Sequence, residues 1–383
     1  MRIVLNFIGL STGGGRTDAI NLLATMPSQA PNDHFLAVVP FGSGYEEVPL
    51  SDNCVIYPVR RRRFNNFFRI LFDNFAMPKI CRDFSADVLF TMCNNGPIRV
   101  PCRHVVMLRR PQFAYNRVEL LAARIKVSPT LRILRWLYQI SIKGADALIF
   151  QTATMRDRVE GSYSFSAPSF LVGKTVSAPI ATSTNDEYNS QQISRVERAR
   201  AGLSFLYLTK YYPHKNIEGA CEAVGVARDR GLDVSLTITL ASSEGPACNR
   251  LIDRINAGEF GDAVINVGPV DLANIASLYS QADAVLAPTL LESYSATFLE
   301  AMKYQKPILT SDRDFSREIC GDAAMYFEPL SLETIVGAIQ MLHDDPSLRK
   351  TLIQSGEKRL ENSDQAWTQI AEEYLQILRA VTE

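Results

Sequence analysis

The sequence predicts an α/β protein built from two doubly wound, Rossmann-like domains. At 383 residues, the chain exceeds the length at which a single hydrophobic core stops growing. Short apolar, β-branched runs alternate with helical stretches along the whole chain, which is typical of parallel α/β folds. The alternation stops at 175–190, where small and polar residues show no periodicity, and then restarts. We expect a first domain over 1–180, a second domain over 190–365 and a closing helix over 366–383.

Apolar runs mark the expected strands of the first domain. These runs are Ile3–Gly9, Phe35–Pro40, Cys54–Val59, Asp87–Met92, His104–Leu108, Ala147–Gln151 and Phe170–Val172. Two long helical stretches lie between them, at Phe64–Lys79 and Val118–Ile142. The first run is too short for a signal peptide and lacks a cleavage site, so we interpret it as a strand. No run of 18 apolar residues occurs, so no membrane-spanning helix is expected.

The second domain repeats this alternation of strands and helices. Its expected strands are Ser204–Leu208, Val234–Leu240, Val264–Val267, Ala284–Pro288, Pro307–Thr310 and Met325–Phe327. Doubly wound sheets bind ligands beyond the carboxyl ends of their strands. The residues that follow each strand are therefore the candidates for chemistry.

The charges are distributed unevenly between the two halves of the chain. The net charge is −1, but residues 1–190 carry 22 Lys and Arg against 14 Asp and Glu, whereas 191–383 carry 18 against 27. A hydrophobic content of 46% and a charged content of 21% are close to globular averages and exclude a disordered chain or a coiled coil. The basic first half predicts an anionic partner on that side, such as a phosphate-bearing acceptor or a membrane surface.

Cysteine and histidine spacing gives no sign of a metal site. The seven cysteines form no C-x-x-C pair, and the four histidines show no zinc-binding spacing. Reduced, packed thiols are typical of a cytosolic protein. We expect a cytoplasmic protein without a bound metal.

A strand, a loop and a helix start form the most informative segment, Ala284–Met302. The strand ends near Pro288, the loop carries Glu292, and a helix that starts near Ser295 carries Glu300 in its second turn. The amides of a helix start bind phosphate, and serine there is a good N-cap. A nucleotide sugar would place hydroxyls at both glutamates and its diphosphate on the amides. The alternative is that both glutamates are ordinary solvated charges near a helix start, and the spacing alone does not decide between the two.

The second half of the chain contains several short motifs in a characteristic order. In chain order these motifs are Leu278-Tyr-Ser-Gln-Ala-Asp-Ala-Val285, then Glu292-x7-Glu300 followed directly by Ala-Met, then Lys306-Pro-Ile-Leu, and finally Gly321-Asp-Ala-Ala-Met-Tyr-Phe-Glu-Pro329. Over roughly 203–378 the chain strongly resembles the retaining family 4 glycosyltransferases (glycosyl transferases group 1). Their GT-B fold has two Rossmann-like domains facing across a cleft, and the final helix packs back on the first domain. The first half of this chain resembles the family only in layout.

The resemblance assigns roles to residues after two strands. Glu292 would contact the transferred sugar and Glu300 the ribose. Lys210 and Lys215 match positions where the family usually has Arg and Lys that bind the donor phosphates. Two cations can neutralise a diphosphate leaving group, although a lysine at 210 lacks the bidentate fork of arginine. The alternative is a helix N-terminus with incidental lysines.

A further set of residues completes the expected donor site. Val267-Gly-Pro-Val270 resembles the segment whose backbone meets the base, which leaves a UDP- and a GDP-sugar equally open. The loop Gly9–Arg16 lacks the G-x-G-x-x-G order, so it favours close approach to the donor or acceptor, or a plain tight turn, over dinucleotide binding. We predict catalytic roles for Glu292, Lys210 and Lys215, and donor contacts from Glu300, Ser293, Tyr294, Ser295, Ala296, Val270, Gly14 and Gly15.

The expected acceptor site departs from the family pattern. The family often carries a His-Asp pair after a strand of the first domain, but here Arg109 and Arg110 follow His104–Leu108. These arginines are candidates for binding a phosphate-bearing acceptor. Asn94 and Asn95 can hydrogen-bond an acceptor sugar, or they simply form a turn.

A basic and aromatic segment predicts membrane contact. Four consecutive arginines precede a helix with an aromatic face, a combination that suits an anionic bilayer. The alternative is a core-packed helix with solvated arginines. The candidate membrane residues are Arg60, Arg61, Arg62, Arg63, Phe64, Phe67 and Phe68.

We therefore expect a retaining glycosyltransferase of the hexosyltransferase type. It would move a sugar from a nucleoside diphosphate to a hydroxyl of a glycan or lipid-linked acceptor, in bacterial-type polysaccharide or glycolipid assembly. We expect no cofactor besides the nucleotide-sugar substrate, no nucleic acid, and contact with the inner face of the cell membrane. The alternatives are a GT-B sugar-nucleotide epimerase and a non-catalytic nucleotide-sugar or membrane-binding protein.

Overall fold

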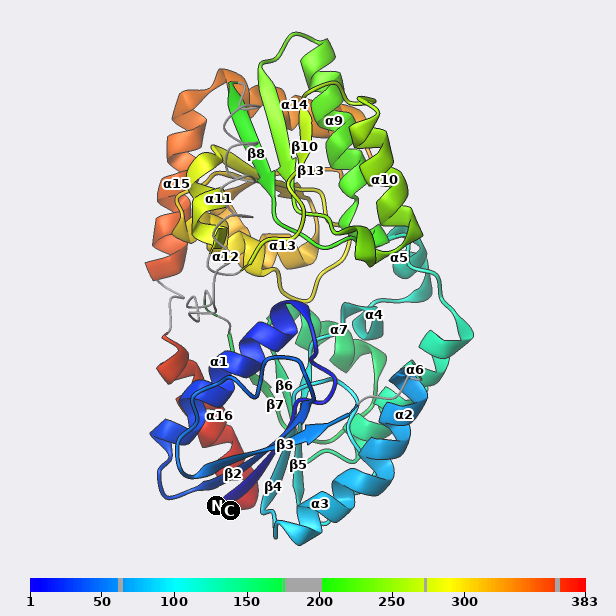
Figure 1. Ribbon diagram of the computed structural model, residues 1–383, viewed down its shortest axis with the longest axis vertical. Helices are drawn as coiled ribbons and strands as arrows, with labels where there is room; N and C mark the ends of the chain where they lie inside the picture. Colours follow the sequence, from blue (N-terminus) through cyan, green and yellow to red (C-terminus); the bar gives the residue numbers. More distant parts are fainter. Residues whose placement is uncertain (61–64, 174, 176–201, 272–273, 362–365) are drawn as a thin grey trace. The chain divides into compact units, whose positions relative to one another are not determined.

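The chain forms two compact units, each described here by itself (Figure 1). The computed structural model describes residues 1–383 except 61–64, 174, 176–201, 272–273 and 362–365. The expected linker lies outside the described residues apart from Thr175. The first unit comprises Met1–Leu120, Lys126–Ser177 and Gln365–Glu383, and the second comprises Leu121–Ile125 and Ala178–Asp364.

A parallel sheet forms the centre of the first unit. Its order is β3-β2-β1-β4-β5-β6-β7, so the order reverses direction between β1 and β4. The central strands are buried on both faces, as their continuous apolar runs predict. The strands are β1 Arg2–Asn6, β2 His34–Pro40, β3 Cys54–Val59, β4 Val88–Thr91, β5 Arg103–Leu108, β6 Ala147–Phe150 and β7 Ser169–Leu171.

Helices connect these strands. They are α1 Gly13–Gln29, α2 Asn65–Leu71, the π-helix Phe72–Ala76, α3 Met77–Asp83, α4 Pro111–Ala114, α5 Arg117–Ala122, α6 Pro129–Lys143 and α7 Ala153–Ser162. The last two residues of α5 belong to the second unit. The helix expected at Phe64–Lys79 is confirmed over its described residues, and it continues to Asp83 through a π-helical turn. Pro78 lacks the N–H that would continue regular α-helical bonding across this turn.

The single helix expected at Val118–Ile142 was wrong, because the structure has two helices there. α5 ends at Ala122 and α6 begins at Pro129. Proline is favoured in the first turn of a helix and disfavours α geometry in the residue before it. Ser128 caps the new helix by accepting a hydrogen bond from Leu131 N at 3.2 Å.

The last helix of the chain, α16 (Trp367–Thr382), belongs to the first unit. Figure 1 shows it beside α1, although the two helices are more than 300 residues apart in sequence. Tyr374 packs its ring 5.2 Å from that of Phe90 on β4, and its hydroxyl lies 3.5 Å from Met107 Sδ on β5. Arg379 Nη2 lies 3.4 Å from Asp33 Oδ2.

The second unit has a parallel sheet in the order β10-β9-β8-β11-β12-β13, which reverses direction between β8 and β11. Its strands are β8 Leu203–Tyr207, β9 Val234–Ile238, β10 Val264–Asn266, β11 Ala284–Ala287, β12 Ile308–Ser311 and β13 Ala324–Phe327. Its helices are α9 Ile217–Asp229, α10 Pro246–Asn256, α11 Ile275–Gln281, α12 Ala296–Lys303, α13 Asp314–Cys320, α14 Leu332–Asp344 and α15 Pro346–Glu361. Short 3₁₀ turns lie at Pro213–Lys215, Ser242–Glu244 and Gly321–Ala323. One core cluster joins the strands and helices of this unit.

Candidate functional site

The candidate site of the second unit lies where its sheet reverses direction. Lys210 and Lys215 follow β8, and Glu292 and Glu300 follow β11. These two strands are neighbours in the sheet, so the residues after them meet at its carboxyl edge. Ligands of doubly wound sheets bind at such a reversal point.

An ion pair joins the two segments. Lys215 Nζ contacts Glu292 Oε1, although the residues are 77 positions apart. Both side chains are largely buried, with exposed fractions of 17% and 12%. Thr289 donates a hydrogen bond from its hydroxyl to Glu292 Oε1 at 3.3 Å. The two charges are therefore held in one place.

Backbone contacts hold the Pro213–Lys215 turn against the loop that carries Glu292. His214 O accepts a hydrogen bond from Leu290 N at 2.7 Å. Tyr207, fully buried at the end of β8, donates its hydroxyl to Lys215 O at 2.9 Å. Asn216 closes the turn in the left-handed region at φ 51° and donates to Pro329 O at 2.8 Å.

Burial favours the neutral forms of two side chains here, His214 in the turn and Tyr207 at the end of β8. It lowers the pKa of His214 below its ordinary value, an effect that Glu292 opposes. Burial also raises the pKa of Tyr207 well above its ordinary value, and the nearby Glu292 carboxylate raises it further. The Tyr207 hydroxyl is therefore protonated at neutral pH and is a hydrogen-bond donor.

Glu300 lies on α12, as the sequence predicts. Its Oε2 accepts a hydrogen bond from the hydroxyl of Tyr279 at 3.1 Å, and Tyr279 stacks on Tyr304 with ring centroids 4.8 Å apart. Ser295 is the N-cap residue of α12, but its side chain makes no capping hydrogen bond. Ser295 thus occupies the expected N-cap position, but its hydroxyl accepts no hydrogen bond from a first-turn amide.

Lys210 lies in the same loop as Lys215 and is exposed. Residues that follow β9 hold this loop: Thr239 Oγ1 accepts a hydrogen bond from Thr209 N at 3.1 Å, and Glu244 of the 3₁₀ turn accepts one from Tyr211 N at 2.8 Å. After β10, Gly268 takes φ 78° and donates to Asn266 Oδ1 at 3.2 Å. Val270, the expected base contact, follows this turn and packs partly against the core.

The glycine loop of the first unit lies at the other reversal point, after β1. Gly14 and Gly15 are in the first turn of α1. A Cβ on Gly15 would meet Leu10 at 3.2 Å and the Arg109 guanidinium at 3.7 Å. Arg109 Nη2 forms an ion pair with Asp18 Oδ2 at 2.5 Å, and their side chains are only 12% and 2% exposed. The structure thus brings together Gly15 and Arg109, two candidate residues from distant parts of the sequence.

The remaining acceptor candidates are placed by the loop after β4. Asn94 Oδ1 accepts from the backbone N–H groups of Arg109 and Arg110, each at 2.7 Å, and Asn94 has φ 70°. Asn95 donates to Leu134 O at 3.1 Å. These contacts favour the turn interpretation of the two asparagines and leave Arg110, which is exposed, as the more accessible arginine.

His104 is a packed strand residue, as expected. Its Nε2 lies 3.0 Å from Thr91 Oγ1, and burial lowers its pKa to about 4. The residues that sequence reasoning missed are the buried supports Tyr207, Thr289, Asn216 and Tyr279. Only Asn216, in the Lys-Asn pair before a helix, carried a local signal, because asparagine tolerates the left-handed region.

The segment expected to contact a membrane is only partly described. Arg61, Arg62, Arg63 and Phe64 lie outside the described residues, as does the side chain of Phe67. Arg60 stacks over Phe41, with Cζ 5.0 Å from the ring centroid. Phe68 packs against a core cluster of the first unit, with its ring 6.1 Å from that of Phe72. This packing corresponds to the core alternative for that one residue.

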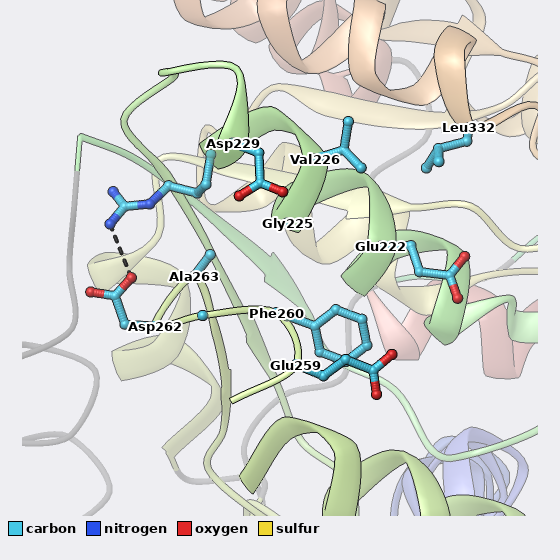
Figure 2. Close-up of a pocket in the computed structure, with 11 residues that line it drawn as sticks. Glu222, Gly225, Val226, Asp229, Glu259, Phe260, Asp262, Ala263 and Leu332 are labelled. Atoms are coloured by element: carbon cyan, nitrogen blue, oxygen red, sulfur yellow. Dashed lines mark hydrogen bonds and ion pairs between the residues drawn. The ribbon is translucent and has the colours of Figure 1, made fainter. Parts of the chain in front are cut away.

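A separate cavity of about 510 Å³ lies at the amino edge of the second sheet, opposite the carboxyl edge that carries the candidate site. Its wall includes Glu222 on α9 and Phe260, Asp262 and Ala263, which directly precede β10 (Figure 2). Arg228 pairs with Asp262 at 3.0 Å within it. None of the predicted site residues lines this cavity.

The described part of the chain contains no group of three or more His, Cys, Asp or Glu residues arranged to hold a metal ion. No helix within the described ranges is both long and apolar enough to cross a bilayer.

Comparison with known proteins identifies sequence relatives for part of the chain. The profile of the family "Glycosyl transferases group 1" matches residues 191–359. An α-D-kanosaminyltransferase of Streptomyces kanamyceticus is 24% identical over 232 residues, 58% of each chain. The O-antigen chain mannosyltransferase RfbU of Salmonella typhimurium is 23% identical over 212 residues, 55% of each chain. The alignments thus span little more than half the length of these relatives.

Solved structures match the whole chain. A sucrose-phosphate synthase from Thermosynechococcus elongatus has a TM-score of 0.76 at 15% identity, covering 100% of this chain and 99% of its own. HepE of Anabaena, solved with UDP-glucose, has a TM-score of 0.72 at 12% identity. The match covers 99% of this chain and 100% of HepE. WaaG, a glycosyltransferase of lipopolysaccharide biosynthesis, has a TM-score of 0.70 at 14% identity, and the match covers 99% of each chain. Together with the two parallel sheets, these matches confirm the expected GT-B fold of two Rossmann-like domains.

Proposed function

We propose that this protein, whose residues 191–359 match the family Glycosyl transferases group 1, transfers a sugar from a nucleoside diphosphate to a hydroxyl group. The observation that carries the proposal is the ion pair between Lys215 and Glu292 at the reversal point of the second sheet. The pair places a cation and a hydrogen-bond acceptor side by side. A nucleotide sugar needs both, because its diphosphate is anionic and its sugar is a neutral polyol.

The donor would replace this ion pair with two separate contacts. Lys215 would turn to the diphosphate, assisted by Lys210 and by the amides that start α12 after Ser295. Glu292 would accept hydrogen bonds from the sugar hydroxyls, and Glu300 from the ribose. Breaking a partly buried pair is compensated only when each charge finds a new partner, so the site favours a ligand that offers both.

In the transfer step, the bond between the anomeric carbon and the phosphate oxygen breaks, and its electron pair leaves with the diphosphate. Lys210 and Lys215 stabilise the charge that develops there. The acceptor oxygen bonds to the anomeric carbon on the same face, and its proton passes to the leaving phosphate oxygen. This front-face reaction retains the anomeric configuration without a protein nucleophile.

We propose a glycan or lipid-linked acceptor that meets the first unit at Arg110, next to the glycine loop residues Gly14 and Gly15 that are expected to approach the donor. The support is the glycine loop at the reversal point of the first sheet, where Gly15 lies against the Arg109 guanidinium, and the exposed Arg110 that follows Arg109 in sequence. The names of two similar proteins, an O-antigen chain mannosyltransferase and a glycosyltransferase of lipopolysaccharide biosynthesis, fit polysaccharide or glycolipid assembly.

A thermal-shift panel of UDP- and GDP-sugars tests the donor site. A donor at about 100 times its dissociation constant should add about 2.7 kcal/mol to the free energy of unfolding, which raises the melting temperature. Lys215→Ala should remove this shift. A protein that no nucleotide sugar stabilises would contradict the proposal. Product analysis with and without acceptor then separates transfer from epimerisation, and turnover of the donor excludes a non-catalytic binder.

Glu292→Gln tests the chemistry at one residue. The variant keeps the size of the side chain but loses the charge that faces the sugar, so transfer should fall roughly 100-fold or more while the fold persists. Glu259→Gln is the matched control, since Glu259 lies in the cavity at the opposite sheet edge. Steady-state rates and circular dichroism of both variants give the comparison. Near-normal turnover in Glu292→Gln would remove Glu292 from the site.

A further inference from the structure

Two helices of the first unit expose apolar side chains to solvent. On α6, Ile133 and Trp136 are 55% and 59% exposed. On α2 and the π-helical turn that follows it, Leu71 and Phe75 are 41% and 73% exposed. A tryptophan and a phenylalanine with most of their surface in water call for an explanation, because burying such rings is strongly favourable.

The exposed side of α6 is a defined helical face. Ile133 and Trp136 are three residues apart, and Lys143 follows Trp136 by seven, so all three lie on one side of the helix. The opposite side carries the buried residues Tyr138 and Ile142. The apolar side chains of this exposed face are therefore not part of the core of the unit.

The loop after β4 connects the two helices. Asn95 donates to Leu134 O on α6 at 3.1 Å, and its own carbonyl accepts from Arg69 on α2 at 2.7 Å. Ile98 N donates to Asn74 Oδ1 at 3.0 Å, which places Ile98 next to the residue before Phe75. Figure 1 shows α2 and α6 on the same side of the unit. We call the exposed residues of the two helices and this loop the α2–α6 surface: Leu71, Phe75, Ile98, Arg99, Arg132, Ile133, Trp136 and Lys143.

The exposed charges on the α2–α6 surface all have one sign. Arg99, Arg132 and Lys143 are exposed cations. In the described stretches 65–76, 94–99 and 129–143 the only acid is Asp73, which is buried and forms an ion pair with Arg69 at 3.3 Å. An apolar surface with cations and without exposed acids complements a layer that is anionic outside and apolar beneath.

We propose that the α2–α6 surface binds an anionic lipid bilayer, with Trp136 and Phe75 inserted at the interface and the cations on the lipid head groups. Tryptophan is enriched at membrane interfaces because its ring is apolar and its N–H is polar. Lipid binding of this kind does not depend on sugar transfer, so the proposal stands apart from the proposed function. It also differs from the membrane segment expected from the sequence, since its residues are described and most of them lie elsewhere in the chain.

Intrinsic fluorescence offers a direct test, because the chain has two tryptophans. Trp367→Phe leaves Trp136 as the only reporter. Vesicles of phosphatidylcholine with phosphatidylglycerol should shift the emission to shorter wavelength, whereas pure phosphatidylcholine should shift it much less. An unchanged emission spectrum with the anionic vesicles would overturn the proposal.

Vesicle flotation then locates the surface. Arg132→Gln with Lys143→Gln should weaken binding roughly 25-fold, since each cation near an anionic surface contributes about fivefold. Trp136→Ala and Phe75→Ala should weaken it as well, and high salt should oppose the remaining binding. The matched controls are Lys303→Gln with Lys350→Gln, and Met341→Ala, which change exposed residues of the second unit. Equal loss in the controls, or full binding by the α2–α6 variants, would overturn the assignment.

Two further measurements, of self-association and of the donor thermal shift, distinguish lipid binding from dimer formation and from a failure of the donor site. Self-association in vesicle-free buffer that Trp136→Ala abolishes would assign the surface to a second copy of the chain and overturn the lipid proposal. The donor thermal shift should be unchanged in Trp136→Ala. A failure of lipid binding with an intact donor shift would therefore leave the proposed function untouched.

Discussion

At the scale of single residues, the site depends on buried side chains that the sequence did not single out. Glu292 and Lys215 were expected from their motifs, but Tyr207 and Thr289 hold them in place. Tyrosine and threonine at strand ends are common in any α/β protein, so their identity carried no signal. Their role follows from the hydrogen bonds that only the folded chain forms.

His104 predicts a pH dependence of stability. Burial lowers its pKa from 6.5 to about 4 in the folded protein. Between these values the unfolded chain binds a proton that the folded chain does not, so the free energy of unfolding decreases as the pH falls. The contribution of this one group should reach about 2 kcal/mol between pH 7.5 and 5, at 1.36 kcal/mol per unit of pKa shift. Above about pH 7.5 this group contributes little pH dependence.

Urea unfolding at several pH values checks this expectation. His104→Asn should show a weaker loss of stability on acidification than the unmodified protein. His34→Gln is the matched control, because it replaces a histidine that is exposed at the start of β2. The same acid sensitivity in His104→Asn and the unmodified protein would show that other groups cause it.

At the scale of elements, the turn between β8 and α9 shows how local geometry places a candidate functional side chain. Asn216 is the N-cap residue of α9 in the left-handed region, at φ 51° and ψ 43°. Its side chain is fully buried against Pro329 O. The turn directs Lys215 toward Glu292 and the following residues into the helix.

Asn216→Ala should destabilise the protein by about 2–3 kcal/mol. The left-handed conformation costs roughly 1–2 kcal/mol with a Cβ that cannot hydrogen-bond locally, and the lost hydrogen bond costs about 1 kcal/mol. Asn216→Gly should lose less, because glycine removes the backbone strain. Denaturant unfolding of the two variants gives the comparison. If glycine at 216 proved as destabilising as alanine, backbone strain would not be the cause.

At the scale of the whole molecule, α16 connects the end of the chain to the first unit. The final helix follows the second unit in sequence but packs on β4 and β5 through Tyr374. Tyr374 is 2% exposed, and burial raises its pKa to well above its ordinary value. The two units are thus not consecutive segments of the chain.

Tyr374→Ala should destabilise the first unit by about 3–5 kcal/mol, the usual cost of deleting a large buried aromatic side chain. Hydrogen exchange should show the loss of protection in β4, β5 and α1, with little change in the second unit. Tyr374→Phe keeps the packed ring and should cost much less. Equal loss of protection in both units would contradict the assignment of α16 to the first unit.

The sequence by itself determined the class of fold and indicated the candidate donor site. Strand positions could be predicted to within one to three residues, because buried parallel strands need continuous apolar runs. The candidates Glu292, Glu300 and Lys215 could be named because their motifs are local. Tertiary structure alone decided the ion pair across 77 residues, the burial of Arg109 against Asp18 and the exposure of Trp136. These features arise from contacts between distant segments. An aromatic side chain on an amphipathic helix has the same sequence pattern whether a neighbouring element covers it or solvent does.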